Sequence, residues 1–360
     1  MIFQLFATRF GRLSGIPSRR WSTGLLLTGL LLLPGPRLFA RTLDIYFIDA
    51  EGGAATFIVT PLKESILVDT GWRREDGRDA KRIEAVARAA GLERITYLVT
   101  THFHRDHYGG IGRLVQLIPV DNFLDHGPMD ELKEDPQFPL YYTEYIRATR
   151  GNRQRIRPGD TIPLRSLQVP LKLLCVSAAG DTLKGEGPAN PACGKLTRKK
   201  KDTTDNARSV GLLLSYGAFE FLDLGDLTWN VESRLACPSN LLGQVDLYQT
   251  THHGLANSNN PVLVSAVAPR VAVFNNGSRK GAAPEVFNLL KSLPSVDAIF
   301  QVHKNLDSGP GGNAPEDFIA NLGGDEDCAG HLLKVSVSAD GSTYAVTNGR
   351  NNLSRTFFTR

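Results

Sequence analysis

The chain lacks several features that would define its class. Its longest apolar run, residues 24–33, is about half of the ~20 residues that a membrane-spanning helix needs. It has no G-x-S-x-G element and no phosphate-cradling glycine loop, so neither serine-hydrolase nor P-loop chemistry is supported. It has only 4 cysteines, which allow three pairings between which the sequence cannot choose, and buried free thiols are the alternative: Cys175, Cys193, Cys237 and Cys328.

An excess of charge is also missing once the first 40 residues are set aside. The whole chain has 41 Lys and Arg against 37 Asp and Glu. Five arginines and no acid precede residue 41, so 41 less 5 leaves 36 bases against 37 acids. The sequence pI of about 8.8 therefore belongs to the N-terminal segment. Net charge gives no support for nucleic acid as a partner of the remaining chain.

The first 40 residues have the order of a signal peptide. Arginines without acids flank the apolar run, and Ala40 offers a small residue for cleavage. We expect cleavage near Arg41, a periplasmic or secreted protein of residues 41–360, and no transmembrane span in that mature chain. An uncleaved anchor is the alternative.

Histidine is concentrated in one stretch of the chain. Of 8 histidines, three fall within six residues together with an aspartate: His102, His104, His107 and Asp106. The stretch follows an apolar run at 95–99 that predicts a strand. In extended backbone, side chains two apart project the same way, so the first two histidines can bind one ion. Asp106 and His107 then face a second position, and both are residue types that borderline metals prefer.

This H-x-H-x-D-H pattern at the end of a strand resembles the signature of the metallo-β-lactamase superfamily. Residues 66–71, 224–226 and 251–254 resemble its other motifs, in the right order. The resemblance implies an α/β (α+β) fold, a four-layer αββα sandwich with two divalent ions at one sheet edge, Zn²⁺ before Mn²⁺. The His-His-Gly ending and the run from Asn206 to Ser209 resemble the hydrolase domain of competence-type DNA-uptake proteins.

The resemblance also implies roles for single residues. Two ligands serve the first ion, three serve the second and one carboxylate bridges both: His102 and His104; Asp106, His107 and His253; and Asp226. The two carboxylates, Asp106 and Asp226, are the candidate catalytic groups. The first ion is one histidine short of the set that most members with two zinc ions supply.

Further residues are expected in the second shell or near the substrate: Asp69, Asn206, Ser209, His252, His126, His303 and Lys280. Asp69 would accept a hydrogen bond from a ligand imidazole and fix its tautomer. A place in the core is the alternative for His126 and His303. Lys280 is a candidate contact for an anion.

Apolar periodicity gives a coarse outline of the fold. It predicts strands at residues 43–48, 54–60, 65–68, 95–99, 120–124, 209–215, 218–222, 245–249, 271–274, 298–302, 332–338 and 343–347, and helices at 79–90, 110–117, 229–235 and 284–290. Residues 127–160 and 177–205 lose this period, so we expect them to be insertions in one domain. Such insertions usually serve as lids or binding loops; a solvated charged helix is the alternative at 127–160, and a solvated charged face is the alternative for the run at 198–201.

These features predict an exported hydrolase in which two metal ions generate a bound hydroxide near neutral pH. The arginines and lysines of the two insertions favour a phosphodiester or related anionic ester. The alternatives are a lactone or β-lactam hydrolase, a metal-dependent redox enzyme, and a non-catalytic metal-binding protein. The complete ligand set argues against the last.

Overall fold

The computed structural model describes residues 41–324 and 328–360, so the expected signal peptide at 1–40 lies outside the described residues. Its α-helices are α1 (Arg78–Ala89), α2 (Arg105–Tyr108), α3 (Ile111–Leu117), α4 (Phe138–Thr149), α5 (Trp229–Ala236), α6 (Pro261–Val267) and α7 (Pro284–Ser292). In these two ranges, no helix combines the length and the apolar character needed to cross a bilayer.

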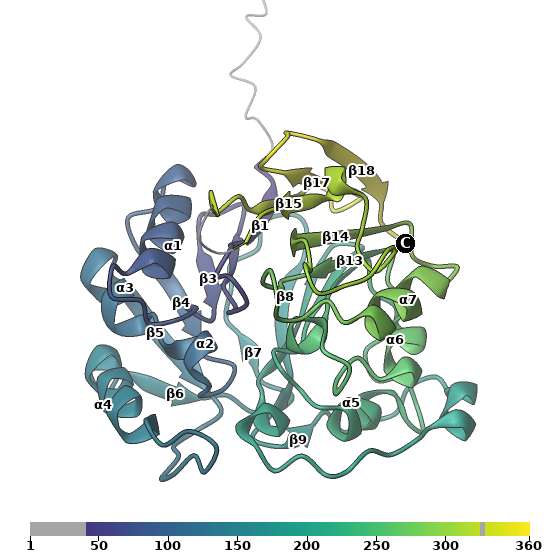
Figure 1. The fold of residues 1–360 in the computed structure, drawn as a ribbon, viewed down its shortest axis with the longest axis horizontal. Coiled ribbons are helices and arrows are strands. Elements are labelled where there is room, and N and C mark those ends of the chain that lie inside the picture. Colours follow the sequence, from purple (N-terminus) through teal and green to yellow (C-terminus); the bar gives the residue numbers. More distant parts are fainter. Residues whose placement is uncertain (1–40, 325–327) are drawn as a thin grey trace, which may run out of the picture. The chain divides into compact units, whose positions relative to one another are not determined.

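The strands form two sheets of nine (Figure 1). The first has the order β18-β17-β16-β1-β2-β3-β4-β5-β6, with bounds Ser354–Phe358, Thr343–Asn348, Leu333–Val337, Leu43–Phe47, Thr56–Val59, Ser65–Val68, Ile95–Val99, Val120–Asp125 and Arg153–Arg155. The second has the order β15-β14-β13-β12-β11-β10-β8-β7, with β9 beside β8, and bounds Ile319–Asn321, Ala298–His303, Val271–Phe274, Leu247–Gln249, Phe219–Asp223, Gly211–Tyr216, Leu171–Ala178, Thr161–Ile162 and Asp181–Thr182.

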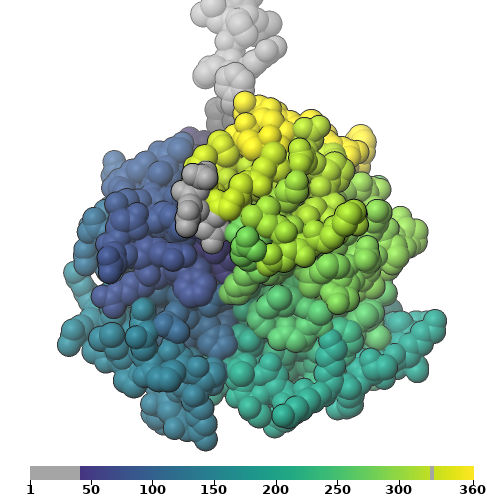
Figure 2. All heavy atoms as spheres, viewed as in Figure 1, coloured from purple at the N-terminus to yellow at the C-terminus, as the bar shows by residue number. Residues whose placement is uncertain are grey.

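The sheets and helices make four layers. One apolar cluster joins the facing sides of the sheets and includes Phe47, Phe221 and Phe300. A second lies between the first sheet and α1, α3 and α4, and a third lies between the second sheet and α5, α6 and α7. Figure 1 shows these helices on the two outer sides, so the structure confirms the αββα sandwich. Figure 2 shows the first and second halves of the chain meeting along the middle of one face.

Parallel strands determine where the polar loops lie. β3, β4, β5 and β6 are mutually parallel, and so are the strands from β11 to β15. Their carboxyl ends therefore emerge at one edge of each sheet, which is where open α/β sheets bind ligands. The loops that follow β3, β4, β11 and β12 carry Asp69, His102, Asp226 and His253.

Several elements differ from the sequence expectation: α6, β8 and β18 were not expected, and the two expected insertions contain regular structure. Residues 127–160 contain α4, whose buried Phe138 and Tyr145 pack against the first sheet, so this segment is not an irregular loop. Residues 177–205 contain β9 and the 3₁₀ helix Pro191–Lys195. A disulfide joins Cys193 to Cys237, and Cys175 is a buried free thiol.

Candidate metal centre

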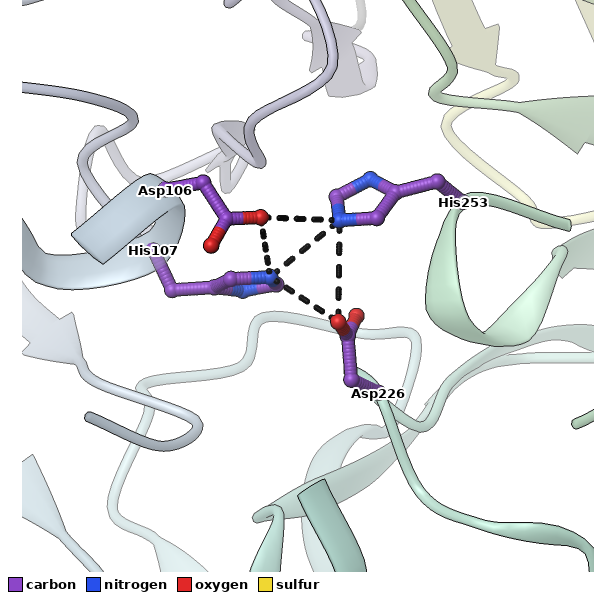
Figure 3. Close-up of side chains that lie close together, drawn as sticks. All are labelled: Asp106, His107, Asp226 and His253. Atoms are coloured by element: carbon purple, nitrogen blue, oxygen red, sulfur yellow. Dashed lines mark hydrogen bonds and ion pairs between the residues drawn. The ribbon is translucent and has the colours of Figure 1, made fainter. Parts of the chain in front are cut away.

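Two loops from the two sheets meet at the centre of the site. After β4 the backbone is extended at His104 and then enters α2. This places Asp106 and His107 on one short helix. From the second sheet, Asp226 follows β11 and His253 follows β12. Figure 3 shows the side chains of Asp106, His107, Asp226 and His253 pointing toward one another.

The donor atoms of these four residues all lie within 4.8 Å of one another. His107 Nε2 is 3.2 Å from Asp226 Oδ2 and 3.3 Å from Asp106 Oδ2. His253 Nε2 is 3.3 Å from Asp106 Oδ2 and 3.2 Å from His107 Nε2. Ligands about 2.0–2.1 Å from a tetrahedral Zn²⁺ are roughly 3.3 Å apart, so nitrogen and oxygen donors at this spacing fit such an ion. These residues would hold the second of the two expected ions.

Two more histidines, His102 and His252, lie beside the Asp226 carboxylate, and His104 lies beside His102. His102 Nε2 is 3.0 Å from His104 Nδ1 and 3.9 Å from Asp226 Oδ2. His252 Nε2 is 3.3 Å from Asp226 Oδ2. The structure therefore places His252 at bonding range of the expected bridging residue, although the sequence favoured only a second-shell or substrate role for it. It can supply the donor that the first position was expected to lack.

Hydrogen bonds outside the cluster fix the orientation of the imidazoles. His107 Nδ1 donates to Asp69 Oδ2 at 2.7 Å, and Asp69 also accepts from Thr101 N at 2.8 Å. His253 Nδ1 donates to the carbonyl oxygen of Asn275 at 3.1 Å. Both bonds use Nδ1, so Nε2 is the nitrogen that faces the cluster and would bind an ion. Asp69 thus occupies the supporting position expected from the sequence.

One glycine allows the loops to approach this closely. Gly225 precedes Asp226 and has φ 55°, and a Cβ there would lie 2.9 Å from Thr101 Cβ. A side chain would therefore push the Asp226 loop away from the β4 loop.

The site combines opposite charges in a buried environment. Burial alone would raise the pKa of Asp226, but the three histidines beside it hold that pKa well below its usual value. Burial lowers the pKa of His107, but Asp226, Asp106 and Asp69 raise it well above the usual value. Burial, His107 and His104 all lower the pKa of His102. At neutral pH both carboxylates are ionised, as metal ligands must be.

A lysine lies at the rim of the cluster. Lys280 Nζ forms an ion pair with Asp106 Oδ2, and it lies 5.4 Å from the centre of the Trp72 ring. Burial raises the pKa of Asp106, but Lys280 and His107 hold it well below the usual range. Lys280 is therefore at the site, beside the carboxylate of Asp106, and its contact with a substrate anion stays a prediction.

Ser209 lies beside Asp226, and Asn206 lies beside His252. Ser209 Oγ accepts a hydrogen bond from the Asp226 backbone N–H at 3.2 Å, and Asn206 Nδ2 lies 3.4 Å from His252 Nε2. Ser209 thus holds the Asp226 loop, and Asn206 contacts His252.

The structure does not bring the other two candidate histidines, His126 and His303, to the cluster. His126 Nε2 bonds to Asp205 Oδ2 at 3.0 Å, and that carboxylate accepts the backbone N–H of Phe103 at 2.7 Å. His126 supports the metal loop only through these two bonds. His303 Nε2 bonds to Asp49 Oδ1 at 2.7 Å, so it belongs to a different group.

One supporting carboxylate, Glu134, was not among the residues expected at the site. Glu134 Oε1 lies 3.2 Å from His104 Nε2 and accepts the backbone N–H of Asp205 at 2.9 Å. The imidazole N–H donates to it, which leaves His104 Nδ1 as the lone-pair nitrogen that faces His102. Glu134 lies in the insertion at 127–160, where no sequence period indicates which acid turns inward.

We expect Glu134→Gln to weaken binding of the first ion by about 10- to 100-fold, because it removes the charge that orients His104. Competition with a chelator measures this affinity directly, without a substrate. Glu131→Gln is the matched control, since Glu131 is 71% exposed and pairs only with Lys133. Equal affinities in the two variants would contradict a supporting role for Glu134.

Comparison with known proteins agrees with this site. Residues 48–172 match the model of the metallo-beta-lactamase superfamily. A stretch of 56 residues is 43% identical to hydroxyacylglutathione hydrolase from Alkalilimnicola ehrlichii. The match covers 16% of this chain and 20% of that relative, so it spans only a fifth of the relative's length.

Solved structures with a similar arrangement include a variant of the β-hydroxylase CmlA from Streptomyces venezuelae, at 15% identity, a TM-score of 0.43, and coverage of 72% of this chain and 52% of that one. Another is MEM-A1, a subclass B3 metallo-β-lactamase from a soil metagenome library, at 15% identity, a TM-score of 0.34, and coverage of 73% and 77%. The matched segment lies within the sandwich of two sheets that carries the buried His and Asp site of a metallo-hydrolase, so the chain has the metallo-β-lactamase fold.

Proposed function

We propose that this protein is an exported metal-dependent hydrolase that cleaves a phosphodiester or a related anionic ester. The observation that carries the proposal is the buried group of Asp106, His107, Asp226 and His253 with the cation of Lys280 at its rim. When bound, a pair of divalent ions lowers the pKa of a water molecule from near 16 toward 7 and polarises the group under attack.

The chain's own residues orient the reactants and balance their charge. Asp106 and Asp226 are ionised, so each can accept a hydrogen bond from the attacking water and align it. Lys280 can turn from Asp106 to a substrate oxygen, because its side chain is 35% exposed and ends at the site. A lysine placed there stabilises negative charge that develops on an ester during attack.

Basic residues near the site support an anionic substrate. Arg208 is 39% exposed and lines a cavity of about 580 Å³, but it pairs with Asp205 there, and three more acids line the same cavity, so this cavity does not itself favour an anion: Asp130, Glu131 and Glu134. On the other side, Lys199 bonds to the carbonyl oxygen of Ala256 in the loop that follows His253. The run at 198–201 therefore borders a loop of the site. The resemblance of residues 206–209 and 251–254 to competence-type hydrolase domains favours the same class of bond.

We expect an activated phosphodiester such as bis(p-nitrophenyl)phosphate to be cleaved with a kcat/KM at least about tenfold above that of nitrocefin, because a tenfold difference needs only ~1.4 kcal/mol of added charge stabilisation. Initial rates with zinc- and manganese-loaded protein measure the ratio. Turnover of nitrocefin or of a lactone without phosphodiester cleavage would favour the alternative hydrolases.

Substitution of the basic run tests its part in this preference. Changing Arg198, Lys200 and Lys201 to Ser while keeping Lys199 leaves the anchor to Ala256 intact. We expect the KM for the phosphodiester to rise severalfold and the KM for a neutral ester to stay the same. A parallel rise for both substrates would place the effect in the fold and not in charge recognition.

Export is proposed from the order of residues in the first 40 positions, and the disulfide between Cys193 and Cys237 is typical of an oxidising compartment. N-terminal sequencing of the protein recovered outside the cytoplasm should give a start near Arg41. A soluble cytoplasmic protein that begins at Met1 would contradict export.

A further inference from the structure

A second buried group of metal-ligating residues lies outside the site described above. It contains Asp49, His303 and Cys328, whose donor atoms all lie within 4.8 Å of one another. Asp49 follows β1, His303 ends β14, and Cys328 belongs to the segment before β16. Asp49 and His303 are fully buried and Cys328 is partly exposed. The two groups share no residue.

The geometry does not fit a catalytic thiol. In a Cys-His-Asp triad the imidazole stands between the thiol and the carboxylate and takes the thiol proton. Here the carboxylate stands in the middle. Asp49 Oδ1 is 2.7 Å from His303 Nε2, and Asp49 Oδ2 accepts the Cys328 thiol at 2.9 Å. Burial and Asp49 raise the pKa of the Cys328 thiol to about 12, so the thiolate nucleophile is scarce.

The spacing of the nitrogen and the sulfur suits a tetrahedral ion. His303 Nε2 and Cys328 Sγ are 3.8 Å apart. Zn–N and Zn–S bonds of about 2.05 and 2.3 Å at the tetrahedral angle put these atoms roughly 3.6 Å apart. The two bonds to Asp49 are of hydrogen-bond length, so the carboxylate must move outward by a few tenths of an ångström to admit an ion. The partly exposed side of Cys328 leaves a fourth position that water can fill.

The charges around the group are also unbalanced without a dication. Two arginines and three carboxylates form one network of ion pairs, a net charge of −1 when all are ionised: Arg78 and Arg82; Asp49, Glu51 and Asp79. A Zn²⁺ ion that displaces the thiol proton adds +2 and −1, which brings the group to zero. A protonated His303 would give the same balance. Zinc bound at Nε2 and a doubly protonated His303 both put a proton on Nδ1, which has no partner among the described residues, so this atom does not distinguish the two states.

We propose that Asp49, His303 and Cys328 form a separate Zn²⁺ site, distinct from the centre at Asp226. Imidazole, carboxylate and thiolate together are a donor set that zinc accepts. The three residues come from parts of the chain up to 279 positions apart. An ion bound there ties the segment at Cys328 to β1 and β14 and stabilises the folded protein.

Cobalt substitution tests this site separately from the other one. Co²⁺ bound by a thiolate gives a near-ultraviolet charge-transfer band, and the centre at Asp226 has no sulfur ligand. Cys193 and Cys237 are joined in a disulfide and Cys175 is buried in the core, so the band reports on Cys328. We expect the band in the full-length protein and in Asp226→Ala. In Cys328→Ser we expect the band to be absent and the zinc content of the zinc-loaded protein to fall by one ion per chain.

Cys175→Ala is the matched control and should keep the band. Asp49→Asn and His303→Gln should each weaken cobalt binding at least tenfold, and they test the site even if one of the variants is unstable. Because the thiol proton is displaced, cobalt affinity should rise by about tenfold per pH unit below the pKa of the thiol. Absence of the band at saturating Co²⁺, or its persistence in Cys328→Ser, would overturn the proposal. Neither result would bear on hydrolysis, which rests on the other centre.

Discussion

Asp226→Ala should lose both metal ions and reduce hydrolysis by on the order of 10³-fold or more, because the ions supply several kcal/mol of transition-state stabilisation. Asp226 Oδ2 lies 3.2 Å from His107, 3.3 Å from His252, 3.6 Å from His253 and 3.9 Å from His102. It contacts histidines of both expected positions. Its removal takes one anionic ligand from each position at once.

Metal analysis after gel filtration, with every protein carrying Cys328→Ser so that only the centre at Asp226 is counted, measures the loss independently of activity. Asp223→Asn is a suitable control, because Asp223 is a buried carboxylate on the same strand end and bonds to the Gly225 backbone N–H through Oδ1. Burial raises the pKa of Asp223 to about 7, so its neutral form is already populated near neutral pH. An Asp226→Ala protein with two ions, or an equal loss in Asp223→Asn, would show that Asp226 does not bridge.

Local pattern was enough to predict the framework of the site. Apolar runs of the right length for strands precede His102, Asp69 and Asp226. The structure has β4, β3 and β11 at these runs. The carboxyl ends of parallel strands then bring these loops together. Burial produces the apolar periodicity from which the strands are predicted. The carboxyl ends of those strands then mark the sheet edge at which the ligand residues gather.

Contacts between distant segments could not be read from the pattern. Glu134 lies 30 positions from His104, and Asp49 lies 254 positions from His303, so the approach of each pair depends on the tertiary fold. The pairing of Cys193 with Cys237 is similar, because several pairings satisfy the same sequence. The helix α4 was missed for a different reason. The inward face of α4 is formed by aromatic residues that are interspersed with charged residues in the sequence. This face can be identified only from its packing against the first sheet.

The conformation of the His-His-Gly loop also lies beyond sequence pattern. His252 and His253 both have positive φ, 57° and 54°, which costs roughly 1–2 kcal/mol for each non-glycine residue. Asn259 Nδ2 bonds to the carbonyl oxygen of Thr251 at 2.8 Å and helps to hold this loop. Strain of this kind persists where the surrounding structure imposes it, and it is concentrated at functional sites. Here it lets two consecutive side chains reach one carboxylate.

The two histidines should therefore have separate roles in metal binding. His253 belongs to the group with Asp106 and His107, whereas His252 contacts Asp226 without joining that group. With His252, the first position has three imidazoles and the shared carboxylate. The second has two imidazoles and two carboxylates, so its added negative charge should give it the higher affinity. Titration of zinc into stripped Cys328→Ser protein, in which only the centre at Asp226 binds zinc, should show two steps.

His252→Ala should remove the weaker step and leave the tighter one, with at least about a 100-fold loss of affinity at the first position, since a ligand matters more than its outer partners. His253→Ala should do the reverse and remove the tighter step. Ser258→Ala, which removes the partner of His252 Nδ1 at 3.2 Å, should have a smaller effect of the same kind. Calorimetry with zinc measures both steps without a substrate. If His252→Ala keeps both steps and only raises the KM, then His252 contacts the substrate, as the sequence first indicated, and the first position binds its ion through His102, His104 and Asp226 alone.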